Sequence, residues 1–123
     1  MAAQEPIFDK REQLVKIREL LLPGEQIDAV FDLKGPQTGF IGITDRRLII
    51  YDRSFLGNKR AMVSVPHKNV ISVGSEDEGS LLSLPGFVTS KLIVQTAVGR
   101  FHLEFSGQEK AHEAYRFILS RIL

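Results

Sequence analysis

Apolar residues near the start of the chain recur at helical spacing. They predict an amphipathic helix over residues 8–22, and Pro23-Gly24 is expected to end it. Asp9, followed three residues later by Glu12, is expected to cap this helix. The apolar positions are Leu14, Ile17 and Leu21.

Between this helix and residue 105 the apolar residues alternate with polar ones, as in strands that bury one face. The alternation predicts seven short strands, and the most regular is the last, where Phe101, Leu103 and Phe105 point one way. Residues 75–86 are too polar and too broken for a strand and are predicted to form a long loop. The predicted strands cover residues 26–33, 39–43, 48–51, 61–65, 70–73, 88–94 and 101–105.

The C-terminal segment, residues 107–123, is predicted to be a second amphipathic helix, with Ser106 and Glu109 as a capping box. Its apolar stripe needs a large apolar partner, and the open end of a small barrel would provide one. We therefore expect a mainly β protein with helices, of the α+β class. Its seven strands form a partly open barrel of two antiparallel sheets, which the C-terminal helix plugs and to which the N-terminal helix is an addition. A chain of 123 residues suits one such domain over residues 1–123.

A sequence motif joins the end of the first helix to the first predicted hairpin. Thr44-Asp45-Arg46 supplies the turn of that hairpin, and Arg46 and Arg47 are expected to form salt bridges with Asp45 or Asp52. The motif reads Leu21-Leu22-Pro23-Gly24-Glu25 and then, after one strand, Gly39-Phe40-Ile41-Gly42-Ile43-Thr44-Asp45-Arg46-Arg47-Leu48-Ile49-Ile50-Tyr51-Asp52.

This motif resembles that of the bacterial pleckstrin-homology-like (PH-like) domains and, more distantly, of the GRAM domains of the same superfold. The resemblance implies a binding or assembly module rather than an enzyme. Related bacterial domains are thought to form rings or other homo-oligomers. In eukaryotic PH domains that bind phosphoinositides, the loop after the first strand carries several cations. Here residues 33–37 contain a single cation, Lys34, so specific phosphoinositide binding is not expected.

Composition narrows the possible partners and the location. Sixteen Lys and Arg are offset by fifteen Asp and Glu, so a nucleic-acid partner is not expected. The chain has no cysteine, which excludes disulfides and thiolate metal sites. It shows no secretory signal pattern and no apolar run near the roughly 20 residues that span a bilayer. A cytoplasmic location is expected, at the inner face of the membrane if the protein binds membranes.

Residues that could carry catalysis or bind a metal are scattered. His67, His102 and His112 form no ligand pair, and no serine lies in a nucleophile motif. The acidic run 76–78 lacks the alternate spacing of a calcium loop and is expected to be solvated. We therefore expect neither catalytic residues nor a bound metal or cofactor.

Two surfaces are candidates for binding. The first is a predicted loop, residues 53–60, in which cations flank an apolar pair as in a membrane-inserting loop; the alternative is that the pair folds back on the barrel. The second is apolar surface beyond the needs of one small core, which favours self-association or a protein partner. The first candidate consists of Arg53, Phe55, Leu56, Lys59 and Arg60, and the second of Leu81, Leu82, Leu84, Ile49 and Tyr51.

The sequence therefore supports three hypotheses. The favoured one is a non-catalytic module that forms homo-oligomers or docks a protein partner. The second is a peripheral membrane binder that uses residues 53–60. The third, a small-ligand barrel or an enzyme, is the least favoured because no acid, base and nucleophile cluster together.

Overall fold

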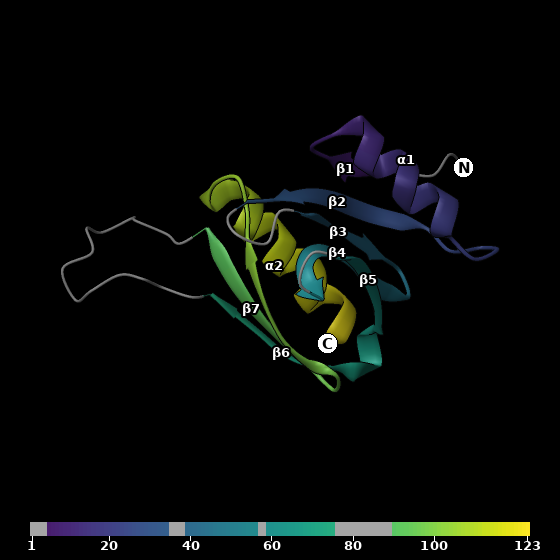
Figure 1. The fold of residues 1–123 in the computed structure, drawn as a ribbon. Coiled ribbons are helices and arrows are strands. Elements are labelled where there is room, and N and C mark those ends of the chain that lie inside the picture. Colours follow the sequence, from purple (N-terminus) through teal and green to yellow (C-terminus); the bar gives the residue numbers. More distant parts are fainter. Residues whose placement is uncertain (1–4, 35–38, 57–58, 76–89) are drawn as a thin grey trace, which may run out of the picture.

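The structure, a computed structural model, describes residues 5–34, 39–56, 59–75 and 90–123; the side chains of residues 52–61 are not described. Two β-sheets face each other, with one helix between them and another on the outside (Figure 1). The elements are β1 (Ile7–Phe8), α1 (Arg11–Leu20), β2 (Ile27–Leu33), β3 (Gly39–Thr44), β4 (Arg47–Leu56), β5 (Lys59–Pro66), the short 3₁₀ helix η1 (His67–Asn69), β6 (Val70–Ser75), β7 (Lys91–Thr96), β8 (Gly99–Glu104) and α2 (Gln108–Ile122).

The strands form a five-stranded sheet in the order β1-β2-β3-β4-β5 and a three-stranded sheet in the order β6-β7-β8. Strands β2 to β5 and β6 to β8 pair antiparallel, as expected. The two sheets meet where Leu33 bridges Phe105 and the Lys34 amide donates to the Glu104 carbonyl at 2.7 Å. The barrel is not closed, and α2 lies between the sheets (Figure 1).

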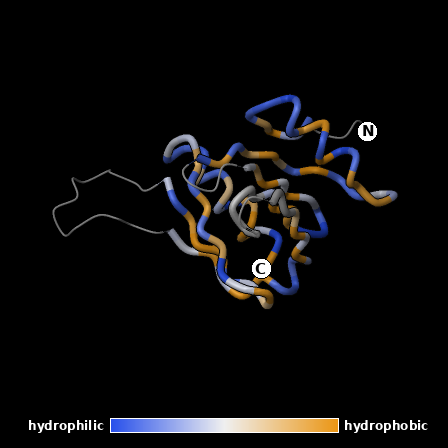
Figure 2. The backbone as a smooth tube through the Cα atoms, viewed as in Figure 1, coloured by the Kyte–Doolittle hydropathy of each residue, from blue (hydrophilic) through white to orange (hydrophobic). Residues whose placement is uncertain are grey.

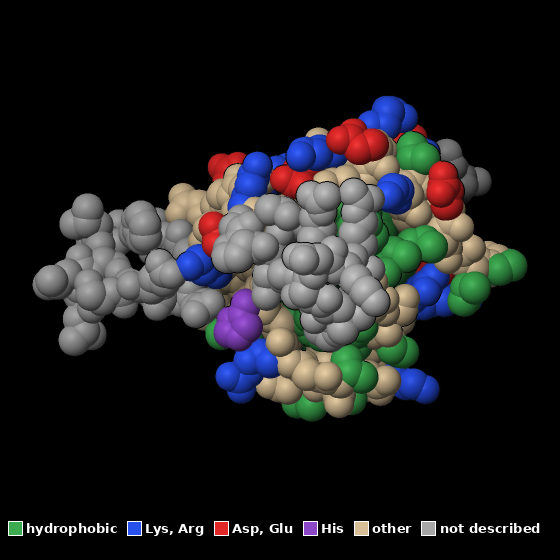
Figure 3. Space-filling view, in the orientation of Figure 1, with side chains coloured by type: hydrophobic (Ala, Val, Ile, Leu, Met, Phe, Trp, Pro, Cys, Tyr) green, Lys and Arg blue, Asp and Glu red, His purple; other side chains and the backbone are tan. Residues whose placement is uncertain are grey.

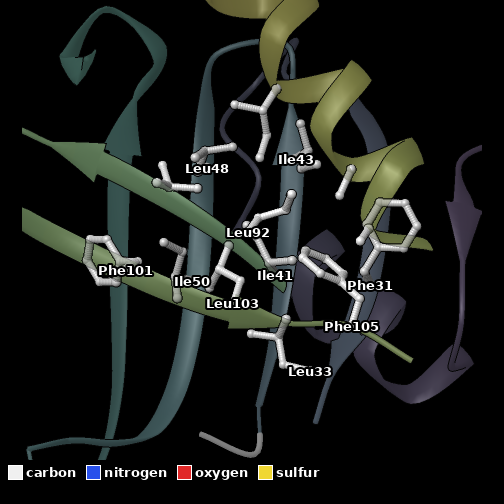
Figure 4. Close-up of a cluster of buried hydrophobic side chains, with 14 of the residues drawn as sticks. Phe31, Leu33, Ile41, Ile43, Leu48, Ile50, Leu92, Phe101, Leu103 and Phe105 are labelled. Carbon is white, nitrogen blue, oxygen red and sulfur yellow. The ribbon is translucent and has the colours of Figure 1, made fainter. Parts of the chain in front are cut away.

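The main core fills the space between the two sheets and α2. Figure 2 shows hydrophobic and hydrophilic residues interleaved along the strands, and Figure 4 shows side chains from both sheets converging beside α2. Phe31 of β2 meets the ring of Phe105 edge-on at 5.8 Å, and Ile118 of α2 is fully buried among these side chains. The predicted stripe of the C-terminal helix therefore plugs the barrel.

A second, smaller core lies on the outer face of the five-stranded sheet, under α1. Leu14 and Ile17 of α1 pack there against the outward residues Val30, Phe40 and Ile49. The sequence placed Ile49 on a surface for self-association. The structure corrects this, because the Ile49 side chain is only 1% exposed. At least part of the apolar surface of β4 is therefore covered by α1.

Gly42 allows α1 to approach the sheet closely. A Cβ atom at this position would lie 2.8 Å from Cδ1 of Ile17, closer than real Cβ contacts. The glycine within this strand therefore makes room for the helix.

Both predicted helix caps are wrong in detail. α1 begins at Arg11, and neither α1 nor α2 has a side-chain capping hydrogen bond. Asp9 is engaged elsewhere: its carboxylate accepts a hydrogen bond from the Asp32 amide at 2.9 Å and lies 3.1 Å from Nζ of Lys110. Phe8, predicted to start the helix, instead lies with Ile7 in β1, which pairs in parallel with β2.

The segment 53–60, expected to be a loop, includes the last residues of β4 and the first residues of β5, which pair as a β-hairpin. β4 runs to Leu56 and β5 begins at Lys59, and these two residues are cross-strand partners. Among the described strands, β3 pairs with β4 only as far as Asp52, so this part of the hairpin extends beyond the sheet. This extension carries no strand pattern, because residues 53–60 are mostly polar and contain Gly57-Asn58.

Candidate functional site

The carboxylate of Glu25 is the centre of a buried polar cluster that joins the two halves of the sequence motif. Its Oε2 accepts hydrogen bonds from the Thr44 hydroxyl at 2.7 Å and from Arg47 Nε at 2.8 Å. Its Oε1 accepts from the Leu22 amide and from Arg47 Nη2, both at 2.9 Å. The hydrogen bonds from Arg47 lower the pKa of Glu25 from its ordinary 4.5 to about 2, although burial acts in the opposite direction. This carboxylate is therefore ionised at neutral pH.

Arg47 ties the cluster to the neighbouring elements. Its Nη2 donates to the Leu20 carbonyl, at the end of α1, at 2.8 Å, and its Nη1 donates to the Ser64 hydroxyl of β5 at 3.0 Å. Arg47 was expected to pair with Asp45 or Asp52, but its carboxylate partner among the described side chains is Glu25. Arg46 Nη2 donates to the Pro23 carbonyl at 3.3 Å, and the Asp52 side chain is not described. Asp45 instead accepts a hydrogen bond from the Gln26 amide at 2.9 Å.

Glu25, Thr44 and His67 are close enough to suggest a catalytic trio, but their hydrogen bonds argue against one. His67 Nε2 lies 2.7 Å from the Thr44 carbonyl oxygen, which can only accept, so Nε2 carries the proton. The Thr44 hydroxyl donates to Glu25 and accepts from the amides of Arg46 and Arg47, both at 3.0 Å. The group that accepts the hydrogen bond of this hydroxyl is Glu25, and its pKa of about 2 makes it a weak base. The cluster holds the turn, the end of α1 and η1 together.

The other titratable residues do not converge on a metal site. His67 lies in η1, His102 in β8 and His112 in α2. Within the described residues, no group of three or more His, Asp or Glu side chains is arranged to hold a metal ion.

Two shallow hollows lie along the outward side of α2. One, of about 380 Å³, is lined by Glu113, Arg116, Phe117 and Ser120; the other, of about 430 Å³, is lined by Gln108, Glu109, His112 and Glu113. Both hollows are open to solvent.

The structure describes the residues predicted for binding only in part. Arg53, Phe55, Leu56, Lys59 and Arg60 lie in the extension of the β4–β5 hairpin, where only the backbone is described. Leu81, Leu82 and Leu84 lie outside the described residues. Ile49 is buried under α1, and Tyr51 stacks on Phe40 with 4.8 Å between ring centroids, with the Lys16 ammonium 5.4 Å from the ring.

An apolar corner of the three-stranded sheet was missed by the sequence analysis. Ile71 is 67% exposed at the start of β6, and Val98 is 66% exposed in the β7–β8 turn. They share this corner because Val70 pairs with Thr96, and the Ala97 amide donates to the Asn69 carbonyl at 3.0 Å. The sequence feature that could have indicated this corner is Val98, a β-branched apolar residue in the tight turn before Gly99.

Charges of both signs lie close together on one side of the molecule. Figure 3 shows Lys and Arg side chains intermixed with Asp and Glu over the side of the molecule that carries α1. In the part of the chain that the structure describes, no helix is long and apolar enough to cross a membrane.

Comparison with known proteins places this fold in a family. The chain is 29% identical over 91 residues to the uncharacterized protein YozO of Bacillus subtilis (strain 168). The aligned segment covers 74% of this chain and 73% of that protein. A pleckstrin homology domain from Shewanella amazonensis SB2B has a similar structure, with a TM-score of 0.64, 15% identity and coverage of 94% of this chain and 100% of that one.

A DUF1696 family protein with a pleckstrin-homology domain, from Shewanella loihica PV-4, is similar with a TM-score of 0.61, 19% identity and coverage of 91% and 92% of the two chains. The family model described as the bacterial PH domain matches residues 21–119, from the Leu-Pro-Gly-Glu motif into α2. With most of its length matched by that model, the chain belongs to the bacterial PH domain family.

Proposed function

We propose that this bacterial PH domain is a non-catalytic assembly module that associates with further copies of itself. The fold supports a binding or docking module in general. The buried polar cluster stabilises the fold. The carboxylate oxygens of Glu25 and the hydroxyl of Thr44 already have hydrogen-bond partners within the chain, so they are not available to a ligand. Binding is therefore expected to use the outer surface.

The observation that carries self-association is the apolar corner, defined as Ile71 and Val98. Two β-branched apolar side chains, each about two-thirds exposed, lie at one corner of the three-stranded sheet. Covering such residues removes apolar area from water, which stabilises an interface by roughly 25 cal/mol per Å². The formal net charge of +1 gives little repulsion between copies.

Light scattering after size exclusion, at micromolar protein, tests the proposal. The wild type is expected above its monomer mass of 13.8 kDa. Ile71→Ser with Val98→Ser should lower that mass while the circular dichroism spectrum is unchanged. The matched control is Val15→Ser with Met62→Ser, which removes two exposed apolar side chains elsewhere. A strictly monomeric wild type, or equal masses for all three proteins, would contradict the proposal.

A second candidate function, membrane docking, is favoured by the extension of the β4–β5 hairpin. Beyond Asp52 the hairpin is two strands wide among the described residues, so its end could reach a flat surface. The sequence of this extension combines cations with Phe55 and Leu56, which suits an anionic bilayer.

Sedimentation with anionic liposomes tests this second candidate. Binding by the wild type should be lost in the variant Phe55→Ala with Lys59→Ala, and it should also be lost at high salt, which screens exposed charges. The control is Arg18→Ala with Val15→Ala, which removes one exposed cation and one exposed apolar residue from α1. A wild type that stays in the supernatant would exclude membrane docking under these conditions.

A further inference from the structure

Strand edges expose unpaired backbone groups, and most of the edges in this fold are short, charged or joined to another strand. β1 has two residues, and β5 contains Lys59, Arg60 and Pro66. The outer side of β8 approaches β2, where the Lys34 amide donates to the Glu104 carbonyl. These features discourage the addition of a further strand.

β6 is different. Among the described strands it pairs only with β7, and its six residues, Val-Ile-Ser-Val-Gly-Ser, include no charge and no proline. Figure 1 shows β6 at the border of the three-stranded sheet. Ile71 is the extra residue of a bulge, since Val70 and Ser72 pair with the neighbours Thr96 and Gln95. The bulge leaves Ser72 to Ser75 as a regular stretch for pairing.

We infer that two copies of the chain pair antiparallel through the free edges of β6, which joins their three-stranded sheets. This inference rests on the proposed self-association and names its surface. The apolar corner lies at the start of the same strand, so pairing of the edges brings the two corners into or beside the interface.

Charge favours the antiparallel direction. Lys68, which is exposed, comes two residues before β6. A parallel pair would bring the Lys68 side chains of the two copies together, whereas an antiparallel pair places them at opposite ends of the paired edges. The antiparallel pair therefore avoids repulsion between like charges.

Gly74→Lys tests the edge, because lysine is a device that blocks strand addition. A Cβ at Gly74 would meet no atom within 4 Å among the described residues, so the monomer should fold normally. We expect the variant to have the monomer mass at concentrations where the wild type is larger. Val15→Lys, an exposed position on α1, adds the same charge and should leave the wild-type mass unchanged.

Cross-linking provides an independent test, since the natural chain has no cysteine. Single variants Ser72→Cys and Gly74→Cys, treated with a short thiol-specific cross-linker, should give covalent dimers, whereas Ser120→Cys on α2 should not. An oligomeric wild type whose mass is unaffected by Gly74→Lys, and whose β6 cysteines do not cross-link, would overturn pairing through β6 but not self-association. A monomeric wild type would overturn both.

Discussion

The lowered pKa of Glu25 makes the stability of the fold depend on pH. Its pKa is about 2 in the folded protein and near 4.5 in the unfolded chain. The carboxylate therefore stabilises the fold fully above about pH 4.5, and this contribution is lost as the pH falls toward 2. Glu25→Gln should reduce the free energy of unfolding near pH 7 by about 1.5–3 kcal/mol, because hydrogen bonds to a charged group are weakened.

Urea unfolding at about pH 7 and about pH 3 checks this prediction. Stability should fall between the two pH values by less in Glu25→Gln than in the wild type. Glu19→Gln, which removes an exposed carboxylate from α1, is the matched control and should behave as the wild type. Parallel pH profiles for the wild type and Glu25→Gln would show that the Glu25–Arg47 pair does not contribute in this way.

Gly42 supports a second prediction at the scale of single residues. Gly42→Ala forces the new methyl group against the fully buried Ile17 and should destabilise the protein by about 1–3 kcal/mol. Combining it with Ile17→Val should cost less than the sum of the two changes, because Val lacks the Cδ1 atom nearest the new methyl group. Gly74→Ala, at an open position, is the control for replacing a strand glycine. Additive costs measured by thermal unfolding would argue against the contact.

At the scale of elements, the sequence predicted the helices and strands whose apolar residues recur with a regular period. The alternation ending in Phe101, Leu103 and Phe105 identified the last strand, and the stripe around Ile118 identified α2. β1 was missed because two residues carry no period, and its pairing with β2 depends on residues 22 positions away, such as Ile7 with Ala29. The end of the β4–β5 hairpin was missed because its residues are mostly polar.

The candidate site was less predictable than the fold because it depends on contacts between distant residues. The motif contains both Glu25 and Arg47, but their pairing across 22 positions required the structure. Ile49 has the sequence properties of a binding surface, and only the position of α1 shows that its partner is within the chain. A strand that is apolar on both faces therefore predicts that both faces are covered. It does not show whether the covering element belongs to the same chain or to a partner.

The packing of α2 between the sheets leads to a prediction for this element. Ile118→Asp places a charge where the side chain is fully buried, so cooperative unfolding should be lost or the melting temperature greatly lowered. Leu123→Asp, at a position that is 93% exposed next to the same helix, should leave the melting temperature nearly unchanged. Circular dichroism during heating distinguishes the two. A variant Ile118→Asp that melts like the wild type would contradict the role of α2 as the plug.

At the scale of the whole molecule, self-association would couple assembly to stability. If folded copies associate and unfolded chains do not, mass action raises the melting temperature as the protein concentration rises. We expect this rise for the wild type over the micromolar range, and a constant melting temperature for Gly74→Lys over the same range.

This comparison separates assembly from folding, because the fold of each copy uses its own two cores whether or not β6 is paired. Differential scanning calorimetry at several concentrations provides the measurement. A wild-type melting temperature that is independent of concentration, together with the monomer mass, would leave the extension of the β4–β5 hairpin as the surface to test next. A rise that persists in Gly74→Lys would instead place the interface away from β6.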